Sequence, residues 1–408
     1  MRSNSSTSVV VAVVVSTFFV GFGGGVVFPI LPNLGSVIGI SPFLVGLILS
    51  ANRLTRIFAN APAGSLVDRI GTRKPLIAGL FVEAVATAAY VVALDAARPA
   101  AWFLVARILW GIGSGVVFAT AYTIAADVSD GDSRGTSMGL VRGGITLGFP
   151  AGLVLGGVVS DVYSVTTAFV LAAGFALLAS VVAYALVPET HVSEHRTSVR
   201  PWELDTATPT LLVGFVNFGL YFAYLGAFFS TLVLFIDARN VGIWGYGPQG
   251  MSGLLMALTV VAASAFTLAG GKASDLQASR TPTLVAFLGV SFAGFALLAV
   301  AETLPTVALG SVLVGTGQGG TMGPLMALLT DLTPSDRMGR AMGTNNVFGD
   351  LGGGLGPMVT LPLLDTLGFE IIFLGCAVVP LLAGGVLVSG LYARTGSLDP
   401  ETGCLADD

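Results

Sequence analysis

The sequence predicts an all-α membrane protein with twelve membrane-spanning helices in two pseudo-symmetric halves of six. Three observations carry this prediction. Of the 408 residues only 10% are charged and 54% are hydrophobic, whereas a soluble domain carries roughly 25% charged residues. Apolar runs of about 20 residues, long enough to cross a bilayer, recur along the chain. The second half also repeats residues of the first half at a constant offset.

Twelve apolar runs are predicted to span the membrane, because each is long enough and lies between polar or turn-forming residues. In the first half they lie at 9–30, 43–64, 75–94, 99–121, 138–160 and 164–187. In the second half they lie at 209–235, 249–271, 282–300, 304–328, 342–364 and 369–393. Since eleven runs follow the first one, we do not interpret it as a cleaved signal peptide.

The longest polar stretch of the chain divides the runs into two sets of six. We therefore predict an N-terminal six-helix half at 1–187, a central cytoplasmic loop at 188–208, a C-terminal six-helix half at 209–396 and a short cytoplasmic tail at 397–408.

Residues after the fourth run recur 204 positions later, after the tenth run. Asp127, Asp132, Gly135, Met138 and Gly139 match Asp331, Asp336, Gly339, Met342 and Gly343. The same offset relates Gly148, Gly152 and Asp161 to Gly352, Gly356 and Asp365. Two halves with the same orientation form a parallel repeat about an axis along the membrane normal.

Basic residues favour one side of the predicted membrane protein. The N-terminus, the connections after even-numbered runs and the C-terminus hold 12 of the 18 basic residues: Arg2, Arg69, Arg73, Lys74, Arg134, Arg196, Arg200, Lys272, Arg280, Arg337, Arg340 and Arg394. The opposite side holds only Arg98 and Arg239. Because basic loops stay in the cytoplasm, we expect both termini there and the chain in the plasma membrane.

Composition and spacing argue against several other classes of protein. The net charge of −5 argues against nucleic-acid binding. Cys376 and Cys404 give no disulfide framework, and His191 and His195 lack further metal ligands. No nucleophile–base pair lies in the runs, so we expect no enzyme, metal or cofactor. A Walker-type G-x-x-x-x-G-K-[ST] is absent, which argues against ATP as the direct energy source.

The connection between the second and third runs carries a specific signature. It reads Gly64-Ser-Leu-Val-Asp68-Arg69-Ile-Gly71-Thr-Arg73-Lys74 and resembles the G-x-x-x-D-R-x-G-R-[RK] loop of the major facilitator superfamily of secondary transporters. A decayed copy with Asp275 and Arg280 stands between the eighth and ninth runs. The resemblance covers nearly the whole chain. It implies the twelve-helix fold of that superfamily, in the lipid bilayer and able to work as a monomer.

Two further motifs lie in the fourth and fifth runs. Arg107-Ile-Leu-Trp110-Gly111-Ile-Gly113-Ser-Gly115 is similar to the family's R-x-x-x-G-x-G-x-[GA] signature. The fifth run looks like the Gly/Pro-rich motif of antiporter branches, although Phe149-Pro150 replaces the usual Gly-Pro pair. The residues of this helix-packing motif, with their second-half counterparts, are Gly144, Gly148, Pro150, Gly152, Gly156, Gly356 and Pro357. They indicate either closure during transport or ordinary tight helix packing.

The resemblance implies a gating role for loop 64–74, as a cytoplasmic latch that holds the halves together in the outward-open state. Gly64 would let its helix pack closely on a neighbour, and Asp127 is the expected partner of the loop. The gating candidates are Gly64, Asp68, Arg69, Gly71, Arg73, Lys74, Asp127, Asp275 and Arg280. Positive-inside topology with helix capping explains the same residues without a gate.

Charged residues inside the runs are costly in hydrocarbon, so they are candidates for function. They are Arg53, Arg56, Glu83, Arg107, Arg142 and Asp350. The resemblance links Arg107 to proton coupling, and Glu83 and Asp350 are candidate proton carriers. The alternative for each is a structural ion pair, for example between Arg107 and Glu83.

Polar and aromatic residues near the middle of several runs are candidates for lining a substrate cavity. Asn217, Tyr221 and Tyr224 have i, i+4 and i+7 spacing, which places them on one face of the seventh helix. The other candidates are Trp110, Gln318 and Asn346. A stripe of this kind also serves helix packing.

The leading functional hypothesis is a secondary active transporter that works by alternating access, with proton-coupled export of a drug-like or metabolite molecule as first choice. The alternative is an organic-anion or metabolite carrier, since four arginines against two carboxylates inside the runs suit an anion. A transporter-like membrane sensor is the third hypothesis, and the short central loop and tail argue against it.

Overall fold

The computed structural model describes residues 6–128, 134–190, 204–242, 245–277, 279–334 and 337–396. Within these ranges the chain forms helices joined by short connections, and it forms no strand. Asp132 and Asp336, most of the predicted central loop and the predicted tail lie outside the described residues.

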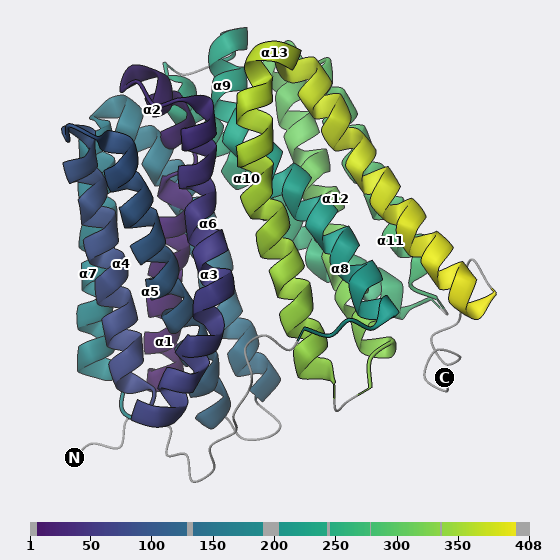
Figure 1. Cartoon of the computed structure of the whole chain (residues 1–408), viewed down its shortest axis with the longest axis horizontal. Coiled ribbons are helices and arrows are strands. Elements are labelled where there is room, and N and C mark those ends of the chain that lie inside the picture. Colours follow the sequence, from purple (N-terminus) through teal and green to yellow (C-terminus); the bar gives the residue numbers. More distant parts are fainter. Residues whose placement is uncertain are drawn as a thin grey trace. The chain divides into compact units, whose positions relative to one another are not determined.

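The helices before the central segment are α1 (Ser6–Val26), α2 (Leu31–Val37), α3 (Pro42–Ile70), α4 (Arg73–Leu94), α5 (Pro99–Asp127), α6 (Arg134–Val162) and α7 (Val165–Leu186). Those after it are α8 (Thr208–Tyr221), the π-helix η1 (Phe222–Phe228), α9 (Phe229–Arg239), α10 (Pro248–Asp275), α11 (Thr281–Ala299), α12 (Leu304–Asp331) and α13 (Met338–Thr395). Figure 1 labels most of these helices along the chain.

Each of the twelve predicted runs coincides with helical structure, which confirms the predicted fold class. The seventh run consists of α8, η1 and α9 in direct succession. The last two runs are the arms of α13, which meet at Gly368, where φ is 74° and ψ is 169°. The sharp bend between the arms is visible in Figure 1. The sequence did not predict α2, because seven residues are too few for hydropathy to mark.

Local sequence explains where several helices begin and end. The Ser41 side chain caps α3, and Pro42 occupies its first turn, both common at helix starts. The same helix ends at Gly71, whose φ of 84° lies in the left-handed region that glycine adopts readily. Thr303 and Thr306 form a reciprocal capping box at the start of α12.

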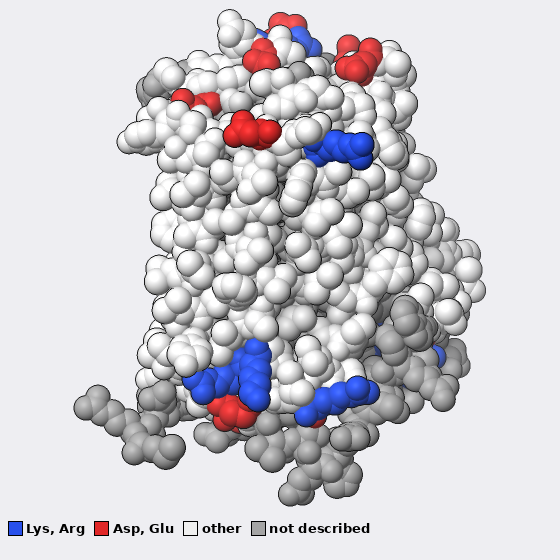
Figure 2. All heavy atoms as spheres, turned by 60° about the vertical axis from the view of Figure 1, so that its left-hand side comes forward, with Lys and Arg blue, Asp and Glu red and all other residues white. Residues whose placement is uncertain are grey.

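Length and polarity of the helices fit a membrane environment. In the described part of the chain, 10 helical stretches are long and apolar enough to cross a membrane. They include α13 once, although it covers two predicted runs, and they do not include α12, whose middle is rich in Gly, Thr and Gln. On the face drawn in Figure 2, charged side chains gather at two ends, and a broad uncharged band separates them.

The chain divides into two compact units. The first consists of Met1–Pro201 and Trp244–Ala257, and the second of Trp202–Ile243 and Leu258–Asp408. One helix, α10, is therefore shared, since its first turns belong to the first unit and its remainder to the second.

Each unit has its own apolar core. In the first unit, α1, α4, α5, α6 and α7 contribute Val13, Leu80, Val117, Val141 and Ala179, among others. In the second unit, α8, α11, α12 and both arms of α13 contribute Val213, Leu284, Leu325, Ala341 and Leu387. These cores fix the helices that carry the polar residues described next.

Candidate functional site

Arg107 on α5 lies in the core of the first unit with 1% of its surface exposed. Its Nε donates to the main-chain oxygen of Ile48 at 3.2 Å, and its Nη2 donates to that of Leu49 at 3.1 Å. The same Nη2 reaches Asn52 Oδ1 at 2.7 Å, and Nη1 reaches the Tyr90 hydroxyl at 3.4 Å. All four acceptors are uncharged, so these hydrogen bonds stabilise the buried cation without a carboxylate.

Glu83 on α4 is also buried, with 2% of its surface exposed, and its Oε1 has no hydrogen-bond partner. It packs on α5 at Gly113, where a Cβ would lie 2.9 Å from Glu83 Cγ. Among the described residues Glu83 and Arg107 form no ion pair with each other, so the example of a structural pair is not found. Tyr90 interacts electrostatically with both charges.

The other charges predicted inside the runs differ in burial. Asp350 on α13 is 7% exposed, and it belongs to the second unit. Arg53 and Arg56 on α3 are half-buried, and the Arg56 guanidinium lies 5.5 Å from the centroid of the Phe118 ring. Arg142 on α6 is exposed. Of the six candidates, Glu83 and Arg107 both interact with Tyr90 in the core of the first unit.

Loop 64–74 is held by a residue that the sequence did not single out, Glu189. Its Oε1 accepts the main-chain N–H of Thr72 at 2.6 Å and the Thr72 hydroxyl at 2.9 Å, and its Oε2 lies 3.3 Å from the Arg73 nitrogen. A Cβ at Gly71 would come within 2.5 Å of this carboxyl group. Glu189 therefore caps the start of α4, where amides without helical partners and the helix dipole favour an anion.

Arg73 and Asp127 connect the same loop to the ends of α7 and α5. The Arg73 Nη2 donates to the main-chain oxygen of Tyr184 at 2.8 Å, and its guanidinium lies 5.5 Å from the centroid of that ring. Asp127 reaches the loop through Thr190, whose hydroxyl lies 3.4 Å from Asp127 Oδ2 and 3.0 Å from the hydroxyl of Thr72. The predicted partner is thus joined to the loop through one intervening side chain.

The remaining loop candidates differ in exposure. Arg69 and Lys74 are exposed, and Asp68 is half-buried. Nothing in the described part of the chain lies within 4 Å of the position that a Cβ at Gly64 would take. The close approach predicted for Gly64 is therefore not found.

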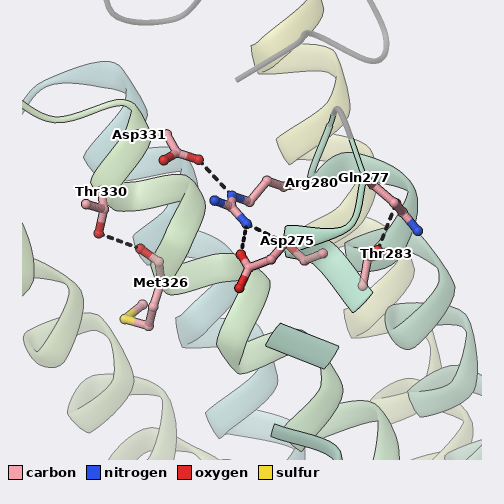
Figure 3. A network of polar contacts seen from close by, with 8 residues as sticks. Asp275, Gln277, Arg280, Thr283, Met326, Thr330 and Asp331 are labelled. Atoms are coloured by element: carbon pink, nitrogen blue, oxygen red, sulfur yellow. Dashed lines mark hydrogen bonds and ion pairs between the residues drawn. The ribbon is translucent and has the colours of Figure 1, made fainter. Parts of the chain in front are cut away.

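The second copy of the loop forms a compact ion-pair network (Figure 3). The Arg280 Nε donates to Asp331 Oδ2 at 2.7 Å, and its Nη1 donates to Asp275 Oδ1 at 2.6 Å. The hydrogen bond to Asp331 is the main reason why the pKa of Arg280 is raised. Although this copy looks decayed in sequence, it retains its charged contacts, because Asp331 and Asp275 both remain.

Among the cavity candidates, Asn217 on α8 faces α13. It is 3% exposed, and its Nδ2 donates to the main-chain oxygen of Asn345 at 2.8 Å. The Oδ1 atoms of Asn217 and Asn345 lack hydrogen-bond partners. Gly349 makes room for this contact, since a Cβ there would lie 2.9 Å from Asn217 Nδ2 and 3.5 Å from the Tyr221 ring. The structure thus joins Asn217 to Asn345, whereas the sequence had indicated the neighbouring Asn346.

The other cavity candidates lie in different local environments. Tyr224 in η1 is 7% exposed and packs edge-on against Phe229, with 5.0 Å between ring centroids. Gln318 is 5% exposed with an unpartnered Oε1, and Asn346 is exposed. Trp110 belongs to the first unit and lies under the guanidinium of Arg107, 5.6 Å from its ring centroid.

The helix-packing glycines bring main chains into contact. A Cβ at Gly148 or Gly152 would overlap the carbonyl oxygen of Phe18 or Phe22 on α1. Gly144 and Gly156 face the same helix, and Gly356 lies against Gly226 of η1. Pro150 and Pro357 lie inside α6 and α13, respectively.

Comparison with known proteins agrees with this architecture. A family model described as Major Facilitator Superfamily matches residues 13–357 and 245–402. The chain is 25% identical over 376 residues to the multi-drug resistance efflux pump PmrA of Streptococcus pneumoniae, covering 87% of this chain and 89% of the relative.

Two solved structures share the fold. A bacterial homolog of the human lysosomal transporter Spinster aligns with a TM-score of 0.80 at 14% identity, over 97% of this chain and 98% of that chain. The human organic anion transporter MFSD10 aligns with a TM-score of 0.66 at 20% identity, over 95% of this chain and 100% of that chain. With its twelve helical runs and a family match along nearly the whole sequence, this chain belongs to the Major Facilitator Superfamily of membrane transporters.

Proposed function

We propose that this transporter exports a drug-like or metabolite molecule in exchange for protons, by alternating access. The observation that carries the proposal is the buried pair of Arg107 and Glu83 in the first unit, with an unpartnered oxygen on Glu83. The relative named a multi-drug resistance efflux pump supports the substrate class.

A buried carboxyl group without a partner is suited to coupling. When a proton binds to or leaves Glu83, the charge of the site changes, and no hydrogen bond to Oε1 offsets the change. Each protonation state therefore favours a different arrangement of α4 and α5. Arg107 can respond through Tyr90, which interacts with both groups.

Further roles follow from the same proposal. The amide oxygens of Asn217 and Gln318 are available to accept hydrogen bonds from a substrate, with Tyr221, Tyr224, Asn346 and Trp110 as additional contacts. Loop 64–74, Asp127 and the Asp275–Arg280 pair act in gating. We place the transporter in the plasma membrane as a monomer with both termini in the cytoplasm.

The test is transport by purified protein in proteoliposomes with an acidic lumen, with ethidium as a permanently charged probe. Wild-type protein should accumulate ethidium inside while protons leave. Glu83→Gln should lower accumulation driven by the pH gradient at least about tenfold and retain exchange without a gradient. Arg107→Lys should lower it as well, because a lysine cannot reach four acceptors in the same geometry.

Glu302→Gln is the control, since the Glu302 side chain is 76% exposed and pairs with Arg239 at 3.6 Å. It should transport as wild type does. Gradient-driven accumulation by Glu83→Gln at the wild-type level would overturn the coupling role. The absence of ethidium transport in wild-type protein would contradict the cationic drug class.

An organic-anion carrier is the second candidate. Arg56 is half-buried against Phe118, and the fold is shared with a human organic anion transporter. Saturable uptake of carboxylates by the same proteoliposomes, lost in Arg56→Gln, would favour this candidate over the first.

A further inference from the structure

Asp161, in the last turn of α6, lies at the start of α10. Its Oδ2 accepts the main-chain N–H of Gly250 at 2.5 Å, and the main-chain N–H groups of Gly247 and Gln249 also interact with the carboxylate. These amides have no partner within their own helix, and an anion is favourable at the positive end of the helix dipole. One side chain of α6 therefore caps α10.

Next to this cap, the main chains of α6 and α10 are in direct contact. A Cβ at Gly157 would overlap the carbonyl oxygen of Gln249, and one at Gly253 would overlap that of Leu153. At Gly250 a Cβ would lie 2.6 Å from Asp161 Oδ2. Small residues on both helices thus allow the carboxylate to reach the helix start.

The division of α10 gives this contact its importance. The turns up to Ala257 belong to the first unit, and those from Leu258 onward belong to the second. In transport by rocking, two halves move against each other. A helix shared by both must then bend or detach at one end. At its start, α10 is held to α6 by the Asp161 carboxylate and by the main-chain contacts at Gly157 and Gly253.

We propose that Asp161 is a positioning residue for transport, whose carboxylate controls how often the start of α10 separates from α6. This role does not depend on proton coupling or on the substrate. Its repeat counterpart, Asp365, is exposed and, within the described part of the chain, forms no hydrogen bond or ion pair. Asp365→Asn therefore removes an equivalent charge without touching the contact.

The experiment measures how fast a thiol in the first turns of α10 reacts with a water-soluble maleimide, followed by mass spectrometry. Ser252 is fully buried in the first turns of α10, directly before Gly253, so the reactivity of Ser252→Cys reports how often these turns lose their packing. Native Cys376, 3% exposed in the second unit, reports general loosening in the same molecule. Cys404→Ala removes the remaining thiol.

Asp161→Asn should raise the labelling rate of Ser252→Cys about tenfold, since charged hydrogen bonds to the helix start are lost. Labelling of Cys376 should not change. Asp161→Glu should restore much of the slow rate. Gly157→Ala should raise the rate by steric separation, whereas Gly174→Ala, where no atom lies within 4 Å, should not.

Two results would overturn the proposal. In the first, Asp161→Asn labels no faster than Asp365→Asn. In the second, labelling of Cys376 rises in parallel with that of Ser252→Cys, so that the variant has loosened the whole fold. A variant that does not yield folded protein is replaced by Gly157→Ala, which opens the same contact without a change in charge.

Discussion

At the scale of single residues, Gly148 sets how closely α6 approaches α1. A Cβ at this position would overlap the main-chain oxygen of Phe18. We expect Gly148→Ala to lower stability by about 1–3 kcal/mol, because two main chains must separate to accept one methyl group. Thermal unfolding in detergent measures this loss.

Gly139→Ala is the matched control on the same helix, since no atom lies within 4 Å of the position that its Cβ would take. In that open space the alanine methyl group meets nothing, and alanine favours the helix over glycine by up to about 1 kcal/mol. Gly139→Ala should therefore be neutral or slightly stabilising. Equal destabilisation by both substitutions would contradict the importance of the α1–α6 approach.

Glu189 is the second residue whose effect we predict. Glu189→Gln keeps the shape of the side chain but removes the charge that caps α4 at Thr72 and Arg73. We expect a loss of about 1 kcal/mol, measured by thermal unfolding in detergent, because an anion at a helix start is worth about that much. Glu302→Gln, which changes an exposed pair, should cause a smaller loss.

The sequence singled out some candidate residues but not their partners. Arg107 and Glu83 stand out because charge in an apolar run is rare. The partners of Arg107 could not be predicted, since two of them are main-chain oxygens of Ile48 and Leu49. Helical spacing placed Asn217 on a face of its helix, but spacing does not tell which neighbour covers that face. In the structure it is α13.

At the scale of elements, the Arg280 network joins the connection between α10 and α11 to the end of α12. The Asp331 side chain is 22% exposed and the Asp275 side chain 68% exposed. We expect Asp331→Asn to cost about 2 kcal/mol and Asp275→Asn less than about 1 kcal/mol, because water screens the exposed pair. Thermal unfolding of the single and double variants, at low and high salt, measures both contributions.

The outcome that contradicts this ranking is a larger loss in Asp275→Asn than in Asp331→Asn. A second check is salt dependence. The contribution of Asp275 should fall at high salt, whereas that of the less exposed Asp331 should change little.

The positions of the helices could be predicted better than the departures from regular α-helix within them. Twelve runs could be located because an apolar stretch of membrane length is a strong signal. The π-helix η1 could not be predicted, since hydropathy does not distinguish helix types. Its close contact between Gly226 and Gly356 depends on residues 130 positions apart in the sequence. The capping of α10 by Asp161 also joins residues that are far apart in the sequence, 89 positions from each other.

At the scale of the whole molecule, the distribution of basic residues predicts topology. With both termini in the cytoplasm, alkaline phosphatase fused after residue 97 should be active, because that connection lies outside. Fusions after residue 190 or after the last residue should be inactive. A fluorescent protein that folds only in the cytoplasm should give the reverse pattern at all three positions. Activity at the C-terminal fusion would contradict the predicted orientation.

The two halves repeat in sequence but differ in their polar contacts. In the first unit a buried arginine lies among uncharged acceptors, and Glu189 holds the loop. In the second unit Arg280 bridges Asp275 and Asp331. The repeat predicts the shared helical scaffold, whereas the residues that differ between the halves decide the polar contacts of each.

The acceptors of Arg107 have an evolutionary consequence. Ile48 and Leu49 bind the guanidinium through atoms that every amino acid possesses. Substitutions at these two positions can preserve the hydrogen bonds, so Arg107 need not co-vary with them among homologues. Covariation would then detect the contact with Asn52 and overlook the two bonds that anchor the arginine to the backbone of α3.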